Sequence, residues 1–447
     1  MHEMAKFGAG ATDSFVTPVT LLALVVTVIL IMLLHRKGII IAIFFFLLLI
    51  PLGQQFYIGG VHLFVHRIII LVGLIRVMSS KGHNQRQHFA GGWNAVDTSF
   101  FLYVLIQAIA FSLQYVNIDA IINQIGFIWD TLGGYFLMRS LIVDRDDIER
   151  ALKCVSYIFA LLAVGMLVEQ IYMINLFGYV GGQLVPDMRD GSVRSLGSFR
   201  HTLTAGAAGA TAIPLFMFLW YRINQRTIAA LGMISATIMT ITAHSSGPLL
   251  AYAAGIIALL VWPLRKHMRI IRWSAAFFLL MLHLVMNAPV WFLIARIDLT
   301  GSSSSYQRAN LMDQFIKHFY EWWLIGTPDQ GNWGWDLWDV QNQYVSVGVE
   351  GGLGALICFI AIIICGYSMI GNASKGIIDE LQERCLWVIG AALFSYMIVF
   401  IGVNLFDQSR LLWFMLLAII STASAPVSPT TVGDIENGPK MDIHRNW

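Results

Sequence analysis

Three arginines stand within twelve residues just before an apolar run: Arg189, Arg194 and Arg200, the last followed by His201. The guanidinium group is permanently charged and planar, so it can donate two parallel hydrogen bonds to phosphate oxygens. The run that follows opens with small residues, TLTAGAAGA, which let another backbone or a lipid chain approach closely. A helix N-terminus also favours anions. This segment predicts a diphosphate site at a membrane surface; the alternative is that the arginines only anchor a helix end among lipid headgroups.

The longest polar interval, residues 296–344, carries groups that suit a sugar substrate. The candidates in it are Tyr306, Arg308, Asp339, Gln341 and Asn342. Five tryptophans accompany them: Trp322, Trp323, Trp333, Trp335 and Trp338. Aromatic faces can stack on sugar rings, but tryptophan also gathers at membrane interfaces, where we expect most of these five. Asp339 is a candidate general base toward a sugar hydroxyl, with a turn or cap residue as its alternative role.

A third polar piece, HSSG at residues 244–247, predicts a tight turn between two apolar runs. His244 can titrate near neutral pH, although a single histidine at a membrane edge is more often a hydrogen-bonding surface residue. Ser246 is a candidate for substrate contact. Nucleophilic serine chemistry is not favoured, because no GxSxG sequence is present.

The composition defines the scaffold that must position these groups. Hydrophobic residues make up 57% of the 447 residues and charged residues 12%, whereas soluble proteins have about 25% charged residues. The apolar runs are roughly 20 residues long without period-2 alternation, which predicts an all-α, polytopic transmembrane helix bundle. We expect 12 or 13 spans, near residues 16–34, 38–52, 61–78, 98–116, 121–142, 154–175, 202–220, 227–243, 246–263, 273–295, 345–370, 386–403 and 411–424.

The distribution of basic residues orients the bundle. Short loops rich in Lys and Arg stay in the cytoplasm, which places RKHMRIIR (residues 265–272) and the loop with Arg222 and Arg226 inside. The loops at 175–201 and 296–344 then face outside, while 144–153 is a cytoplasmic amphipathic loop. Residues 1–425 are expected to form one membrane domain, and 426–447 a disordered cytoplasmic tail.

Composition and spacing also argue against several kinds of partner. A net charge of +2 without a basic, aromatic-interleaved tract gives no reason to expect nucleic-acid binding. The four cysteines lie in apolar runs without CxxC spacing, which supports neither a disulfide framework nor a zinc site. No His or carboxylate cluster has metal-ligand spacing, so no metal and no cofactor is predicted.

Three pieces in order carry a family resemblance. They are RSLGSFRHTLTAGA (residues 194–207), TAHSSGPLLA (242–251), and SYQRANL, WLIGTP and QNQYVSVGVEGGLGALICF within 305–359. Together with the span layout they make the chain resemble the O-antigen ligase and O-antigen polymerase superfamily of bacterial inner-membrane glycosyltransferases. The resemblance implies transfer from an undecaprenyl-diphosphate-linked glycan donor to a glycan or lipid-linked acceptor at the periplasmic face of the lipid bilayer, alongside other polysaccharide-assembly proteins.

Roles follow from the resemblance. Arg194, Arg200 and Arg308 would stabilise the departing diphosphate, and Asp339 and Gln341 are placed to act on the incoming hydroxyl. The residues implied to bind substrate are Arg189, Arg200, His201, His244, Ser246, Tyr306 and Asn342. An O-antigen or exopolysaccharide polymerase is favoured over a ligase to lipid A-core, and both over a protein O-oligosaccharyltransferase.

Two departures from the family pattern leave questions open. Where the family often has Ser-Arg-Gly, this chain has Ser245, Ser246 and Gly247, so one cation is missing. Where ligases usually have His-Asn, it has Gln341 and Asn342, and glutamine cannot act as a general base. Either another residue acts as base, with Asp339, Glu350, His318 and His244 as candidates, or the chain belongs to a polymerase-like branch.

Two functions from other classes stay open: a membrane transporter, and a non-catalytic partner in polysaccharide export. Transporters place ionisable residues within spans. Here such residues are few: Arg67, Asp130, Arg139 and Asp407. Asp130 and Arg139 stand nine residues apart and are too distant along a helix to pair, which favours chemistry at the outer surface.

Overall fold

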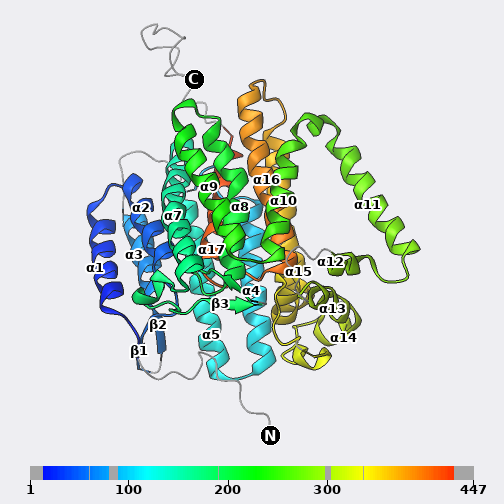
Figure 1. Cartoon of the computed structure of the whole chain (residues 1–447), viewed down its shortest axis with the longest axis horizontal. Helices are drawn as coiled ribbons and strands as arrows, with labels where there is room; N and C mark the ends of the chain where they lie inside the picture. Colours follow the sequence, from blue (N-terminus) through cyan, green and yellow to red (C-terminus); the bar gives the residue numbers. More distant parts are fainter. Residues whose placement is uncertain are drawn as a thin grey trace.

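The computed structural model describes residues 14–59, 61–79, 89–189, 191–296, 304–335 and 337–426. Most of its helices run side by side in one bundle (Figure 1). The first helices are α1 (Pro18–Leu33), α2 (Arg36–Leu49), α3 (Val65–Ser79), α4 (Ala95–Tyr115), α5 (Ile118–Ile128), α6 (Gly134–Leu141) and α7 (Arg145–Tyr172). A π-helical turn, η1 (Trp129–Gly133), joins α5 to α6.

The remaining helices complete the bundle and its polar end. They are α8 (Thr202–Trp220), α9 (Arg226–Thr242), α10 (Ser246–Leu260), α11 (Met268–Val285), α12 (Leu293–Arg296), α13 (Ser304–Lys317), α14 (Phe319–Trp322), α15 (Gln343–Ala373), α16 (Glu380–Gly402) and α17 (Ser409–Ala423). Short 3-10 turns are η2 (Leu176–Val180), η3 (Ile223–Gln225), η4 (Trp262–His267), η5 (Val290–Phe292) and η6 (Gln330–Trp333). Two antiparallel hairpins accompany them: β1 (Gln55–Ile58) with β2 (Val61–Phe64), and β3 (Asp187–Arg189) with β4 (Ser192–Arg194). The predicted all-α fold class is confirmed, with these hairpins as small additions.

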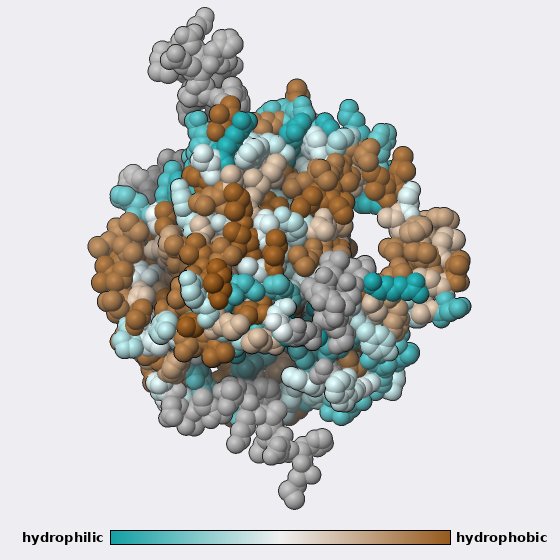
Figure 2. Space-filling model, in the orientation of Figure 1, coloured by the Kyte–Doolittle hydropathy of each residue, from teal (hydrophilic) through white to brown (hydrophobic). Residues whose placement is uncertain are grey.

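Six helical segments in the described part of the chain are long and apolar enough to cross a membrane. They are Ala95–Tyr115, Arg145–Tyr172, Thr202–Trp220, Trp262–Val285, Gln343–Ala373 and Glu380–Gly402. The helices α1, α10 and α17 are apolar but shorter. Figure 2 shows apolar residues across the middle of the molecule and more polar residues toward its two ends. The chain is therefore a multi-pass membrane protein.

Three predicted boundaries were wrong. The span expected near 273–295 is shifted toward the N-terminus, because α11 covers Met268–Val285 and a turn follows it. The span expected at 61–78 begins as strand β2, because residues 61–64 pair with 55–58 and only then turn into α3. The loop expected at 144–153 is the start of α7: Asp144 caps that helix by accepting a hydrogen bond from the backbone N–H of Asp147, at 2.7 Å. Of the predicted tail 426–447, only residue 426 lies among the described residues, so that prediction is untested.

The small residues at the start of α8 are explained by close helix packing. A Cβ atom on Gly209 would meet the backbone oxygen of Ala236 in α9 at 2.5 Å, and one on Gly206 would meet Ala243 at 2.8 Å. Residues 202–216 are all buried. The close approach predicted from this run is therefore made by α9 and α10 of the same chain, and α8 is a fixed central element.

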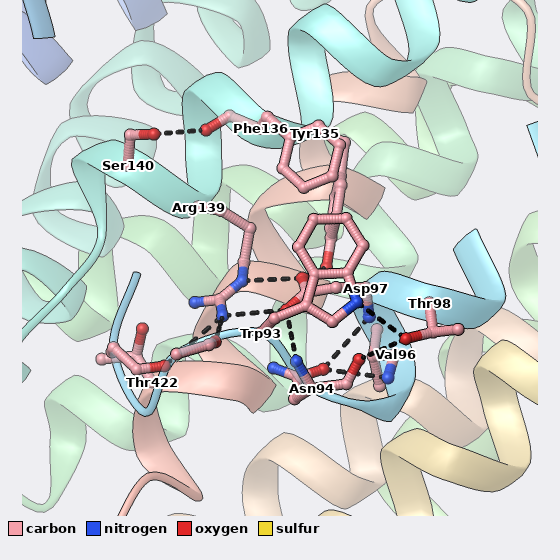
Figure 3. A network of polar contacts seen from close by, with 12 residues as sticks. Trp93, Asn94, Val96, Asp97, Thr98, Tyr135, Phe136, Arg139, Ser140 and Thr422 are labelled. Carbon is pink, nitrogen blue, oxygen red and sulfur yellow. Dashed lines mark hydrogen bonds and ion pairs between the residues drawn. The ribbon is translucent and has the colours of Figure 1, made fainter. Parts of the chain in front are cut away.

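A buried ion pair ties α4 to α6 (Figure 3). The Arg139 Nε atom donates to Asp97 Oδ1 at 3.0 Å, and both side chains have 0% exposure. The Tyr135 hydroxyl donates to the same carboxylate, and an Arg139 Nη atom donates to the backbone oxygen of Gly92. Asp97 also completes a capping box with Asn94 at the start of α4. Arg139 thus pairs with Asp97 and not with Asp130.

Residues 304–342 form a compact unit fastened to α15. The side chains of Phe315, Trp322, Trp333 and Val349 belong to one buried cluster there. Trp322 and Trp333 are core residues, whereas Trp323, Trp335 and Trp338 are exposed, so at most three of the five tryptophans can lie at a membrane interface. Gly352 has φ of 70° and interrupts α15. Next to it, the backbone N–H of Leu353 donates to the backbone oxygen of Trp323 at 2.9 Å, which attaches the unit to α15.

Candidate functional site

A small polar cavity brings together most of the predicted site residues. We call it the arginine cavity. Its lining residues come from distant parts of the sequence: Arg189, Arg194, His201, Leu203, His244, Ser245, Arg308 and Gln341. It lies where α8 and α10 begin, so the connections that carry Arg222 and Arg265, at the far ends of these two helices, lie at the opposite end of the bundle (Figure 1).

The segment that delivers Arg194 and His201 is held by α7. The carboxylate of Glu169 accepts from the backbone N–H groups of Leu196 and Gly197, and the Ser195 hydroxyl donates to the backbone oxygen of Met166 at 2.9 Å. Gly197 has φ of +60°, a left-handed conformation that favours glycine. The turn at Gly197 lets the chain pass from β4 into the first turn of α8.

His201 is the N-cap residue of α8. Its Nδ1 atom accepts from the backbone N–H of Leu203 at 3.1 Å, so the neutral ring carries its proton on Nε2. Burial lowers the pKa of His201 below its ordinary value, and the charge of Arg194 lowers it further, while Asp187, Asp339 and Asp407 oppose this. His201 is therefore a neutral hydrogen-bond donor at neutral pH.

Arg189 and Arg194 lie on the β3–β4 hairpin. Arg194 is 7% exposed, and its Nη1 atom lies 3.2 Å from Asp187 Oδ2. Burial lowers the pKa of Arg194 from its ordinary value, and the charge of Asp187 opposes that shift. The Nε atom of Arg194 is buried and has no hydrogen-bond partner among the described residues. A buried, incompletely paired guanidinium of this kind favours an anionic ligand.

The predicted tight turn between two apolar helices is present before α10, and it adds His244 and Ser245 to the lining of the arginine cavity. His244 has φ of +42° and lies exposed at the rim of the arginine cavity. Arg308 of α13 is buried, and its Nη1 atom lies 3.4 Å from the Ser246 Oγ atom in the first turn of α10. A cation therefore does stand at this turn, although the turn itself lacks an arginine.

Gln341 enters the cavity just before α15. Its Nε2 atom donates to Asp339 Oδ2 at 2.6 Å, which fixes the orientation of the amide. Asn342 is the N-cap residue of α15: its side chain accepts from the backbone N–H groups of Tyr344 and Val345, and it is 1% exposed. Asp339 thus orients Gln341, and Asn342 fixes the start of the helix.

Five predicted residues do not line the arginine cavity: Arg200, Ser246, Tyr306, Asp339 and Asn342. Asp339 and Ser246 instead contact the lining residues Gln341 and Arg308. Arg200 lies one residue before His201, yet its exposed side chain lines a different cavity. Tyr306 is 62% exposed, with its ring centroid 6.2 Å from that of Phe292. Asn342 is buried as a cap. The sequence prediction also missed Ser245 and Leu203 as lining residues, although both lie inside segments that it singled out.

The other general-base candidates lie elsewhere. Glu350 accepts from Ser346 and Gln107 inside the bundle, and His318 stacks on Trp333 with ring centroids 5.1 Å apart. Of the two histidines that line the arginine cavity, His201 caps a helix and His244 does not. Within the described ranges, no group of three or more His, Cys, Asp or Glu side chains is placed to hold a metal ion.

The arrangement favours an anion. Three guanidinium groups face a small polar space at which two helices begin, and each helix N-terminus carries a partial positive charge. A comparison of the sequence with models of known protein families finds no match, and a comparison with curated proteins finds none either.

Proposed function

We propose that the protein is a glycosyltransferase of the inner membrane, of the O-antigen polymerase or ligase type. It moves a glycan from undecaprenyl diphosphate to a sugar hydroxyl on the periplasmic side. The observation that carries this proposal is the gathering of Arg189, Arg194 and Arg308 around one cavity at the start of α8 and α10.

The reaction breaks the bond between the anomeric carbon and a diphosphate oxygen, and forms a bond from that carbon to the acceptor oxygen. Negative charge builds up on the departing diphosphate, so fixed cations around it lower the barrier. Arg194 and Arg308 supply this charge, and Arg189 binds the second phosphate. His201 donates a hydrogen bond from Nε2 to a phosphate oxygen.

The acceptor hydroxyl must lose its proton as the new bond forms. His244 is our candidate for the base, because it lies at the cavity rim and a neutral imidazole has a nitrogen that can accept a proton. Gln341 accepts a hydrogen bond from the same hydroxyl through its amide oxygen, since its nitrogen is engaged by Asp339. Asp339 is thereby a positioning residue.

Our proposed membrane topology has thirteen spans: α1, α2, α3, α4, the α5–α6 unit, α7 to α11, and α15 to α17. The basic connections around Arg222 and Arg265 stay in the cytoplasm by the positive-inside rule, which puts the arginine cavity at the outer face. This topology supports a donor that is presented outside the cytoplasm.

The acceptor decides between three activities. A second lipid-linked repeat makes the enzyme an O-antigen or exopolysaccharide polymerase, which we favour; lipid A-core makes it a ligase, and a protein hydroxyl an O-oligosaccharyltransferase. The absence of the ligase-type histidine at position 341 supports the first choice.

The experiment is a glycan analysis of cells that lack the protein, complemented with the wild type or with Arg308→Ala. A polymerase predicts single repeat units in the deletion and in the Arg308→Ala cells, with long chains restored by the wild type. Complete lipid-linked chains that never reach an acceptor would identify a ligase. An unchanged glycan profile would contradict the proposal and favour a transporter or a non-catalytic assembly partner.

A further inference from the structure

A second cavity is lined by neither Arg194 nor Arg308. It lies between α2, α3, the η1–α6 segment and α17, and we call it the α17 cavity. Arg200 lines it, whereas His201 lines the arginine cavity, so the two cavities flank the start of α8.

The α17 cavity is amphipathic along the membrane normal. His66 and Arg410 lie in the first turns of α3 and α17, at the same end of the bundle as the arginine cavity. Ile70 and Phe414 line it four residues further along these helices, about 6 Å deeper. Leu137 of α6 extends the apolar part. A charged mouth above an apolar interior suits a lipid whose headgroup stays at the surface.

Both carboxylates of the cavity are hydrogen-bonded within the protein. Asp130 receives two hydrogen bonds of 2.8 Å from Arg67 and lies 3.2 Å from His66 Nε2. Asp407 accepts from the Thr204 hydroxyl at 2.6 Å and from the backbone N–H groups of Arg200 and Ser409. Arg67 balances the charge of Asp130, whereas Asp407 is bonded only to neutral groups and keeps its negative charge. With Arg200 and Arg410 at the mouth, one positive charge remains in excess.

The two arginines of the mouth have no ion pair among the described residues. The Nε atom of Arg410 donates to the backbone oxygen of Leu405 at 2.6 Å, and its guanidinium lies 6.0 Å from the ring centroid of Phe127. The side chain of Arg200 is exposed at the mouth. Two such groups above an apolar space match a phosphate headgroup and its tail.

We propose that the α17 cavity binds a phosphate-bearing lipid, with its phosphate between Arg200 and Arg410 and its tail beside Ile70, Leu137 and Phe414. The lipid is either an anionic phospholipid of the bilayer or a polyprenyl phosphate carrier. The proposal of a lipid-binding site depends only on the α17 cavity. That the bound lipid is the acceptor, next to the donor in the arginine cavity, rests on the proposed function.

The test uses the purified full-length chain in detergent with three fluorescent lipids: phosphatidylglycerol, geranylgeranyl phosphate and zwitterionic phosphatidylcholine. Arg410→Gln and Arg200→Gln are each expected to weaken binding of a phosphate lipid by at least about tenfold, because a charge-assisted contact is lost. Arg384→Gln, at an exposed ion pair with Glu380, is the matched control and should bind as the wild type does. Arg200→Gln removes an exposed side chain, so it remains informative if Arg410→Gln does not fold.

The outcomes distinguish the two kinds of lipid, and they distinguish this proposal from the proposed function. Similar affinities for phosphatidylglycerol and geranylgeranyl phosphate would identify the ligand as a bilayer phospholipid. A preference for geranylgeranyl phosphate would identify it as a polyprenyl carrier. Arg194→Gln should abolish glycan transfer and leave this binding intact. The proposal is overturned if Arg194→Gln weakens the binding while Arg200→Gln and Arg410→Gln do not, or if phosphatidylcholine binds as tightly as the anionic lipids.

Discussion

Arg308 of α13 and Ser246 of α10, 62 residues apart in the chain, meet at 3.4 Å between Nη1 and Oγ. The contact joins the unit at residues 304–342 to the central bundle and brings a cation to the N-terminal turn of α10. Its partner across the arginine cavity is Arg194 on the β3–β4 hairpin, so two cations from separate segments face the same space.

Replacing Arg308 or Arg194 with lysine is expected to reduce glycan transfer by at least about tenfold, because lysine keeps the charge but loses the planar, bidentate donor geometry. The measurement is the rate of chain extension with purified enzyme and lipid-linked substrate. The unfolding temperature should change little, since the positive charge is retained. Equal activity in the lysine variants would remove these two residues from the assigned role.

His201 predicts a pH-dependent stability. Its pKa in the folded protein is lowered from 6.5 by burial and by Arg194, so between that lowered value and 6.5 the unfolded chain binds more protons than the folded one. Its contribution to the free energy of unfolding therefore rises with pH across this window and is lost as the pH falls. His201→Asn keeps an N-cap side chain but does not titrate. Thermal unfolding of both proteins over about pH 5 to 7.5 should show a smaller pH dependence in the variant.

Gln341 and Asp339 are expected to act as one unit. Gln341→Ala and Asp339→Asn should each reduce transfer, and the double variant should be no slower than the slower single variant, since Asp339 acts by orienting Gln341. The measurement is a double-mutant cycle on the transfer rate. Independent, multiplying losses would mean that Asp339 contacts the substrate itself.

Gly352 and Gly390 make a matched pair in two neighbouring helices. A Cβ atom on Gly352 would lie 2.5 Å from the backbone oxygen of Leu324, and its φ is 70°, so Gly352→Ala should destabilise the protein by more than about 2 kcal/mol. A Cβ atom on Gly390 would meet nothing within 4 Å, and Gly390→Ala should be neutral or stabilising by about 0.5–1 kcal/mol. Denaturation of the two variants in the same detergent gives the comparison.

Removing one partner of the Asp97–Arg139 pair should cost about 3–5 kcal/mol, because the other charge is left buried without compensation. Arg139→Met and Asp97→Asn are the variants, and detergent-solubilised yield and unfolding temperature are the measurements. A small loss in either variant would show that water reaches this pair.

The sequence predicted the helices of the bundle well where a polar cap adjoins a long apolar run. The predicted span 202–220 coincides with α8, because His201 marks its start and the connection with Arg222 follows its end. The prediction failed at residues 61–64, which are apolar enough for a membrane span but form an antiparallel strand pair with residues 55–58. Such pairing leaves no periodic signal in one sequence.

The sequence identified most of the residues that line the arginine cavity, but it did not predict which residues lie together. Arg194 and Arg200 are six residues apart, yet they line different cavities because the chain turns at Gly197. Arg308 supplies the cation that the turn at residues 244–247 lacks. The two segments are distant in the sequence, so the spacing of residues within either one does not predict this contact. Arg410 was not singled out at all, since it stands alone before the last apolar run.

The position of α17 has a consequence for biogenesis. It is the last helix in the described part of the chain to be synthesised, and from Ser409 to Thr422 every residue except Arg410 is buried, so it occupies the interior of the bundle with little lipid around it. The helices made earlier must leave or open a path for it after they have entered the bilayer. Until that step is complete, the α17 cavity lacks a wall and Asp407 cannot engage Thr204 at the start of α8. Insertion of the last helix therefore sets the moment at which the nascent protein acquires the α17 cavity.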